Sequence, residues 1–221
     1  MAETLEDSGL AEAERVATLS PWPEMTLKDS LSEIKSGFAC GRKVADSGIV
    51  HLRMDNIGTN GRLDLTRITR VDYDKVKAGK WLLKPGDVLF NNTNSKELVG
   101  KSALFTLQDQ DYYYSNHLSR IRVRQDVLTP DWLVLCLRRL WQKGFFQRIC
   151  IQWVSQSAVH PRKLKLAKIP VPPKDEQLRI AAKVERIETR VRQMSGLMEE
   201  TRNEIEAVSA SVLQKALTGS L

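Results

Sequence analysis

Three polar runs of the sequence contain the residue types that recognise nucleic-acid bases. They are residues 91–96 (Asn-Asn-Thr-Asn-Ser-Lys), 115–117 (Ser-Asn-His) and 152–160. Asn and Gln can form two hydrogen bonds to adenine, Lys and Arg can do so to guanine, and Ser or Thr can bond to either base. Because Asn and Ser also favour ordinary surface turns, each run taken alone is equally well explained as a turn. Together the runs predict base-reading side chains, namely Asn91, Asn92, Asn94, Lys96, Asn116, Gln152, Gln156 and His160.

Basic residues in and around these runs are candidates for contacts to phosphate. From residue 118 to 124 the sequence alternates, so that Arg120, Arg122 and Arg124 share one face of a predicted strand. Three arginines on one face repel one another unless they meet anions or are spread in water. The pattern leaves two interpretations open, a strip that faces phosphate and a solvated edge. The residues predicted to contact phosphate are Lys43, Arg53, Lys101, Arg120, Arg122, Arg162 and Lys163.

The motifs of several enzyme classes are missing from the sequence. An adenine methyltransferase needs an Asp/Asn-Pro-Pro-aromatic motif, whereas residues 171–174 (Val-Pro-Pro-Lys) supply only the prolines, and no glycine-rich cofactor loop occurs. Residues 33–35 (Glu-Ile-Lys) match the last part of a metal-dependent nuclease motif, but no acidic partner precedes them at a useful spacing. The three histidines are far apart and lack metal-ligand spacing. We therefore expect a non-catalytic protein that binds no metal or cofactor of its own.

Charge is distributed unevenly along the 221 residues. Residues 174–221 are neutral and residues 1–24 carry a net charge of −5, whereas residues 25–173 carry 25 basic and 13 acidic side chains, a net charge of +12. A basic domain beside a neutral helix favours nucleic acid as the partner. A merely soluble basic surface is the alternative that charge alone leaves open.

The cysteines and the hydropathy pattern indicate where the protein works. Three cysteines without CxxC spacing are typical of a reducing compartment and argue against a thiolate zinc site. No apolar run reaches 18 residues, and the acidic N-terminus lacks the hydrophobic region of a signal peptide. The sequence thus predicts a cytoplasmic protein that makes no membrane contact.

The segments that position the polar runs predict a mixed α/β domain over residues 21–173, after a flexible segment of residues 1–20. Residues 129–131 (Thr-Pro-Asp) combine a capping side chain, a proline at the first helical position and an acid in the first turn, which predicts a helix from there. Strand-like stretches separated by polar turns recur along this domain, at residues 49–54, 88–90, 103–105 and 118–124.

Residues 174–221 predict one long helix with a heptad seam. Steps of 4 and 3 alternate between seam positions for more than four repeats, which is the pattern of a coiled coil, and only Thr201 is polar. The helix is predicted over residues 175–217, after a proline-rich stretch at residues 170–173, and would be about 64 Å long. The apolar seam residues are Ile180, Val184, Ile187, Val191, Met194, Met198, Ile205, Val208 and Val212.

A helix of this length exceeds the width of a small domain, so most of its seam must pack against another long helix. The sequence contains no second heptad segment. We therefore predict that the partner helix belongs to another chain and that the seam dimerises the protein.

The last quarter of the sequence carries a family likeness. Residues 169–180 (Ile-Pro-Val-Pro-Pro-Lys-Asp-Glu-Gln-Leu-Arg-Ile), followed by a heptad helix ending in residues 213–221 (Leu-Gln-Lys-Ala-Leu-Thr-Gly-Ser-Leu), resemble the conserved region of type I restriction–modification specificity subunits. Upstream, residues 22–23 (Trp-Pro), 52–57 (Leu-Arg-Met-Asp-Asn-Ile) and 83–89 (Leu-Lys-Pro-Gly-Asp-Val-Leu) resemble the target recognition domain of that family.

The resemblance implies a non-catalytic subunit in which a target recognition domain precedes a coiled-coil helix that also docks the methylase. It implies modification subunits that methylate adenine with S-adenosylmethionine, and a restriction subunit as a further candidate partner. Family members usually have two recognition domains and two helices that pack antiparallel, whereas this sequence has one of each. We therefore expect a half-subunit that homodimerises and reads a bipartite, palindromic site in double-stranded DNA. An interaction or inhibitor protein that uses the same coiled coil without reading DNA is the alternative.

Overall fold

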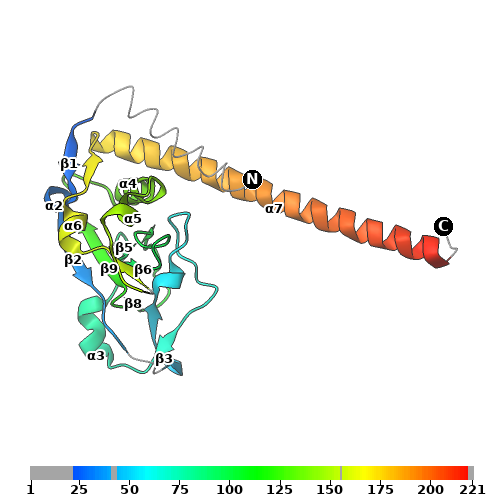
Figure 1. The fold of residues 1–221 in the computed structure, drawn as a ribbon, viewed down its shortest axis with the longest axis horizontal. Coiled ribbons are helices and arrows are strands. Elements are labelled where there is room, and N and C mark those ends of the chain that lie inside the picture. Colours follow the sequence, from blue (N-terminus) through cyan, green and yellow to red (C-terminus); the bar gives the residue numbers. More distant parts are fainter. Residues whose placement is uncertain (1–21, 41–43, 155, 219–221) are drawn as a thin grey trace. The chain divides into compact units, whose positions relative to one another are not determined.

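The computed structural model describes residues 22–40, 44–154 and 156–218 (Figure 1). The predicted flexible segment of residues 1–20 and the predicted phosphate contact Lys43 lie outside the described residues. The described chain divides into two units, a mixed α/β globular unit that ends at Ala181 and a helical unit that begins at Ala182. The predicted fold class, an α/β domain followed by a long helix, is confirmed.

A four-stranded antiparallel sheet lies at the centre of the globular unit (Figure 1). All four residues of its inner strand β5 are buried, because β5 has a neighbour on each side and helix α4 (Pro130–Gln142) contacts it. α4 also contacts β7 and β9. In their order across the sheet the strands are β2 (Leu31–Ser36), β9 (Leu118–Val123), β5 (Val88–Asn91) and β7 (Ser102–Leu104).

A three-stranded sheet joins β3 (Val44–Leu52) to β4 (Arg70–Val71) on one side and, in parallel, to β8 (Tyr112–Tyr114) on the other. Successive side chains of a strand point to opposite faces. Tyr112 and Tyr114 accordingly enter one buried apolar cluster, and Tyr113 enters a second cluster. This alternation lets one short strand contribute to two separate apolar clusters.

Short elements complete the globular unit. A two-stranded sheet pairs β1 (Glu24–Thr26) with β12 (Lys168–Pro170), and a second three-stranded sheet has the order β10-β11-β6. The strands of that second sheet are β10 (Ile151–Gln152), β11 (Ser157–Ala158) and β6 (Thr93–Asn94). The short helices are α2 (Leu27–Ser30), η1 (Met54–Asn56), α3 (Lys75–Ala78), η2 (Gly79–Trp81), α5 (Phe145–Ile149) and α6 (Pro161–Lys165).

The predicted start of a helix at residues 129–131 is confirmed. α4 begins at Pro130, and the Thr129 hydroxyl accepts a hydrogen bond of 3.3 Å from the backbone N–H of Trp132. Such a cap satisfies one of the backbone donors that the first turn of a helix leaves open.

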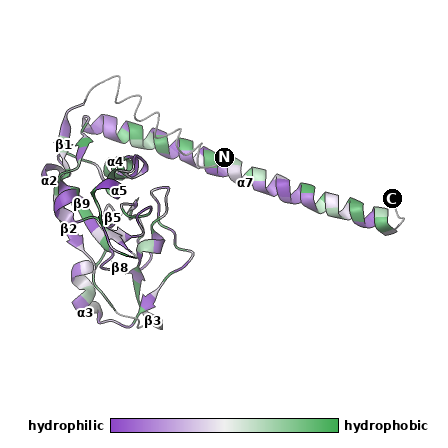
Figure 2. Cartoon of the chain, viewed as in Figure 1, coloured by the Kyte–Doolittle hydropathy of each residue, from purple (hydrophilic) through white to green (hydrophobic). Residues whose placement is uncertain are grey.

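The long C-terminal helix is confirmed as α7 (Lys174–Thr218), which has 45 residues and a length of about 68 Å at 1.5 Å per residue. Apolar residues recur along it between hydrophilic ones (Figure 2). Ile180 and Val184 are each only 3% exposed in the single chain, so these two predicted dimerisation residues are not available to a partner. The seam residues Met194, Met198, Ile205, Val208 and Val212 are 47–62% exposed, while Ile187 and Val191 are half-buried.

Candidate nucleic-acid interface

The structure brings the three predicted polar runs together on one side of the globular unit. The backbone N–H groups of Asn92 and Thr93 donate to the carbonyl of His117, at 3.0 and 3.3 Å, and the N–H of Val159 donates to the carbonyl of Asn92 at 2.9 Å. Strand β6 pairs with β11, so that Asn94 lies opposite Ser157. Runs that are up to about 60 residues apart in the sequence therefore form one surface, which we call the loop surface.

Seven of the predicted residues are exposed or reach solvent on or beside the loop surface. His160 caps helix α6, where its Nδ1 accepts a 3.2 Å hydrogen bond from the N–H of Arg162. Because Nδ1 is the acceptor, Nε2 carries the hydrogen of the ring and can donate to a base. Lys163 donates through Nζ to the carbonyl of Ile149 at 2.9 Å. The seven exposed residues are Lys96, Asn116, Gln152, Gln156, His160, Arg162 and Lys163.

A short hairpin, formed by β10 and β11, carries apolar side chains at its exposed end. Trp153 is 56% exposed, Val154 is fully exposed and Ile151 is 45% exposed. The N–H of Trp153 donates to the carbonyl of Gln156 at 2.7 Å, which closes the hairpin. Exposed apolar side chains beside polar ones are typical of interaction sites, and aromatic rings stack on bases.

Sequence reasoning missed Trp153 and Val154 as functional candidates, because it treated residues 151–168 as irregular and considered only polar and charged side chains. The signal was present as two large apolar residues between Gln152 and Gln156 in a polar run. A buried strand would also show this pattern, so only the structure shows that the two side chains reach solvent.

The predicted base readers Asn91, Asn92 and Asn94 are corrected by the structure. Asn91 is fully buried and donates to the carbonyl of Met54 at 3.2 Å, and Asn92 is 8% exposed and donates to the Ser119 hydroxyl at 2.9 Å. Asn94 is also 8% exposed, and its side-chain oxygen accepts from the N–H of Ser95. These buried amides hold the loops in position, so they are not assigned to base contacts.

Lys101 is corrected for a similar reason. It is 7% exposed and its ammonium group donates to the carbonyl of Ile57. Burial lowers the pKa of Lys101, and the charges of Asp55 and Asp64 oppose part of that shift. Lys101 therefore holds the segment around Ile57 and does not reach phosphate. Arg53 remains a half-buried residue on the same segment.

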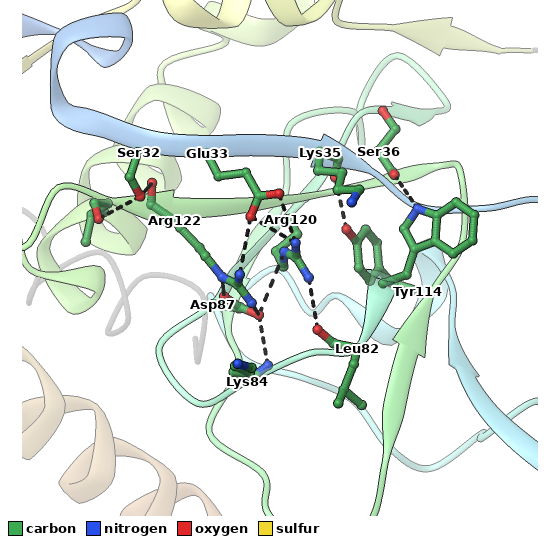
Figure 3. Close-up of polar contacts among 12 residues, drawn as sticks. Ser32, Glu33, Lys35, Ser36, Leu82, Lys84, Asp87, Tyr114, Arg120 and Arg122 are labelled. Carbon is green, nitrogen blue, oxygen red and sulfur yellow. Dashed lines mark hydrogen bonds and ion pairs between the residues drawn. The ribbon is translucent and has the colours of Figure 1, made fainter. Parts of the chain in front are cut away.

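The arginines of β9 meet anions that belong to the same chain (Figure 3). Arg120 is 3% exposed and donates to both carboxylate oxygens of Glu33, at 3.0 and 2.9 Å, and to the carbonyl of Leu82. Arg122 donates to both oxygens of Asp87, at 2.5 and 3.0 Å, and to Glu33 at 3.3 Å. Hydrogen bonding to Asp87 raises the pKa of Arg122.

This network excludes both sequence interpretations of the arginine strand for Arg120 and Arg122, since neither a phosphate strip nor a solvated edge is present. Asp87 holds the Arg122 guanidinium in a two-nitrogen fork, the geometry that arginine and carboxylate favour, whereas Arg120 gives one nitrogen to both oxygens of Glu33. Arg124, at the end of the strand, is half-exposed and pairs with Asp126 at 2.9 Å. Predicted phosphate contacts at Arg120 and Arg122 are thus replaced by structural ion pairs that join β2, β9 and the turn before β5.

The part of the chain that the structure describes holds no group of three or more His, Cys, Asp or Glu side chains placed to bind a metal ion. None of its helices is both long enough and apolar enough to span a membrane.

Comparisons with known proteins identify the relatives of this chain. A sequence profile of the type I restriction modification DNA specificity domain matches residues 20–207. A putative type I restriction enzyme MjaX specificity subunit from Methanocaldococcus jannaschii is 31% identical over 161 residues, which are 72% of this chain and 38% of that protein. The chain therefore spans well under half of this curated relative.

Solved structures of similar fold extend over the whole chain. The HsdS subunit from Thermoanaerobacter tengcongensis is 24% identical, with a TM-score of 0.63, and matches 100% of this chain and 51% of its own. A chain from a study of the assembly and conformational transition of the type I R-M system is 22% identical, with a TM-score of 0.69, and matches 100% of this chain and 54% of its own. At these identities the likeness shows the fold alone.

Proposed function

Because the chain belongs to the family of type I restriction–modification DNA specificity domains, we propose that it is the subunit that reads the DNA sequence for such a system. The observation that supports this proposal most directly is the loop surface, where three separate polar runs meet beside exposed basic side chains. Base contacts specify a sequence, whereas phosphate contacts position the protein on it. The loop surface offers residues for both tasks.

The side chains assigned to DNA are those that the structure leaves exposed. Lys96, Arg162 and Lys163 contact phosphate, where a cation releases counterions and strengthens binding to every sequence alike. The hairpin end enters the groove, where Trp153 and Val154 make apolar contact with bases. The assigned base readers are Asn116, Gln152, Trp153, Val154, Gln156 and His160.

The protein acts as a homodimer in this proposal. The seam of α7 from Ile187 onwards presents apolar residues to solvent, which is costly unless a second helix covers them. Two copies of α7 then hold two loop surfaces, each of which reads one half of a bipartite, palindromic site, because the symmetry of a dimer is mirrored in its DNA. The length of helix between the globular units sets the gap between the half-sites.

The chemistry belongs to partner subunits. Modification subunits that bind S-adenosylmethionine methylate adenine in the site chosen by this protein, and a restriction subunit is a further partner. The outer face of α7 docks the modification subunit. The protein itself supplies no catalytic group, and it works in the cytoplasm on double-stranded DNA.

The test is to co-express the protein with the modification subunit of its own system and to map methylated adenines. We expect methylation at one bipartite sequence. Lys96→Ala should weaken DNA binding to all sequences alike and reduce the slope of log affinity against log salt by about 1, whereas Gln156→Ala should relax the preference at one base position. Lys77→Ala, at an exposed position of helix α3, is the matched control and should leave both quantities unchanged.

The alternative, an interaction or inhibitor protein, gives a different result in the same experiment. Such a protein would bind the modification subunit through α7 and leave its methylation pattern without a bipartite site. Equal affinity for specific and random DNA in the presence of the modification subunit would contradict the proposed function.

A further inference from the structure

The exposed seam of α7 reads nearly the same in both directions about Gly196. Seam positions at equal distances before and after this glycine carry similar side chains. Met194 matches Met198, and Ile187 matches Ile205. The remaining matched positions are Val191 with Thr201, Val184 with Val208, and Ile180 with Val212.

We propose that this symmetry specifies one arrangement of two copies, an antiparallel pair of α7 helices whose two-fold axis passes at Gly196. The inference rests on the proposed homodimer and on the antiparallel packing of helices that is usual in the family, and it adds the register. A two-fold axis places each residue opposite the one equally far beyond the axis in the second copy. The inner matched positions then form layers, methionine on methionine, isoleucine on isoleucine and Val191 on Thr201.

Six layers around the axis are open to a partner. Met194, Met198 and Ile205 are 58%, 58% and 61% exposed, and Ile187 and Val191 are half-buried. Thr201, the polar member, has already used its hydroxyl, which donates to the carbonyl of Leu197 at 2.9 Å. Its methyl group can therefore face Val191 of the second copy without leaving an unsatisfied donor. The outer layers are not used, since Ile180 and Val184 are buried in the single chain.

The charges beside the seam favour the same register. In an antiparallel pair, the residues on one flank of the seam face the same flank of the partner helix. Arg190 lies six residues before Gly196 and Glu204 eight residues after it, so Arg190 of one copy lies on the same flank as Glu204 of the other with an offset of only about 3 Å along the helices, twice by symmetry. The two Leu197 side chains, each 63% exposed, meet beside the axis. No ion pair within the described residues engages Arg190 or Glu204, whereas Arg202 pairs with Glu206 at 3.1 Å in its own helix.

Other arrangements lose these contacts. A parallel pair in register would place Arg190 beside Ser195, Glu204 beside Ser209, and Thr201 against Thr201. A shift of one heptad in the antiparallel pair places a charged side chain, Glu204 or Arg190, against Leu197. Among these arrangements, the antiparallel register about Gly196 is the one that both pairs the apolar seam residues and places opposite charges beside each other.

The register has a consequence for the DNA site. With the axis at Gly196, the two Ala181 residues where the globular units end lie about 45 Å apart along the helices, at 1.5 Å per residue. The number of residues between Ala181 and Gly196 therefore sets the distance between the two loop surfaces.

Single cysteines test the register in the full chain. The native Cys40, Cys136 and Cys150 are first replaced by alanine, and light scattering confirms that this background is still a dimer. Leu197→Cys should then form an intermolecular disulfide on oxidation, because the two side chains meet at the axis. Val208→Cys is the matched control and should not, because its two copies lie about 36 Å apart in this register.

The outcomes separate the register from the proposed function. A disulfide at position 208 without one at position 197 would show a parallel pair, and a dimer that forms neither disulfide would show another register; each overturns the inference and leaves the homodimer intact. If the cysteine-free background protein and the native protein are both monomers, the homodimer and the register are overturned together.

Charge reversal provides a second, independent test. Arg190→Glu or Glu204→Arg alone should weaken the dimer about tenfold, because each turns two attractive contacts into repulsive ones. Arg190→Glu combined with Glu204→Arg should restore the native dissociation constant. Failure of the double variant to recover, with its helix content unchanged by circular dichroism, would contradict the proposed contacts.

Discussion

At the scale of residues, the contacts of Gln177 explain why a glutamine follows the prolines. Its side chain is fully buried, and its oxygen accepts from the N–H of Thr129 at 2.8 Å. Its amide nitrogen donates to the carbonyls of Val127 and Pro172, at 3.0 and 2.9 Å. One glutamine therefore joins the first turn of α7 to the start of α4 and satisfies three backbone groups.

Gln177→Glu should destabilise the protein by about 3 kcal/mol near neutral pH. The substitution keeps the shape but turns the amide donor into a charged oxygen that faces two carbonyl oxygens, without a donor between them. Chemical denaturation followed by circular dichroism measures the change. Gln193→Glu, at an exposed position of the same helix, is the control, and equal stability of the two variants would contradict the role of Gln177.

His51 is expected to make stability depend on pH. It is 1% exposed, with Nε2 3.2 Å from the carbonyl of Phe38 and Nδ1 3.6 Å from the Cys40 sulfur. Burial lowers the pKa of His51 to about 4, with the hydrogen bond to the Phe38 carbonyl opposing this shift and the charge of Arg53 adding to it. Between the ordinary value near 6.5 and about 4, the unfolded chain therefore binds a proton that the native protein does not.

Stability should thus fall as the pH drops from 6.5 towards 4, by about 3 kcal/mol from this residue, and should not change through His51 above pH 7. Urea denaturation at a series of pH values measures the slope. His51→Gln should flatten the profile in this window. A native profile that has the same slope as the variant would show that His51 does not contribute.

At the scale of elements, very short strands position the loop surface. β6, β10 and β11 have two residues each, and backbone hydrogen bonds from β6 to β11 and from Asn92 to His117 hold the three polar runs together. A scaffold of this kind fixes backbone positions while leaving most loop side chains exposed. The side chains on the loops can then differ without loss of the fold.

Alanine substitutions at Gly196, in α7, and at Gly100, just before β7, should change the stability of the protein in opposite directions. Nothing lies within 4 Å of a Cβ added at Gly196, so Gly196→Ala should stabilise the helix by about 1 kcal/mol. Gly100 has a φ of +95°, and its Cβ would lie 2.3 Å from the Phe146 ring, so Gly100→Ala should cost more than about 2 kcal/mol. Thermal denaturation compares the two variants, and a destabilised Gly196→Ala protein would contradict the outward placement of this residue.

At the scale of the whole molecule, the exposed seam ties DNA recognition to dimerisation in our proposal. Val191→Asp together with Ile205→Asp should convert the dimer into a monomer, since both place charge in the seam. Affinity for a palindromic duplex should then fall more than tenfold, because two linked sites bind more tightly than one. Light scattering and fluorescence anisotropy measure the two effects.

Asn203→Asp with Ala210→Asp is the matched control for this experiment, since both residues lie on exposed positions away from the seam. The control protein should remain a dimer and bind the duplex as the native protein does. Persistence of the dimer after substitution of Val191 and Ile205 would show that another surface joins the two copies.

Periodicity and turn chemistry were enough to predict the elements, and they were not enough to predict the site. The heptad spacing predicts α7 to within one residue at each end, and the Thr-Pro-Asp order predicts the start of α4. Both depend on neighbours within a few residues. Of the predicted DNA contacts, Lys96, Arg162 and Lys163 are exposed, whereas Lys101 and Arg120 are buried, although all five are basic residues in or beside polar runs.

The sequence by itself determined the long helix, the positive charge of the globular unit and the polar composition of the three runs, because each is a local or additive property of the chain. Only the tertiary structure decided which polar side chains face solvent. Arg120 is buried because Glu33, 87 residues earlier in the chain, supplies its counter-charge across β2 and β9. Trp153 is exposed because β10, the strand just before it, lies at the edge of its sheet and has no neighbour beyond it there among the described residues. Exposure depends on which distant segments pair, and local pattern does not contain that information.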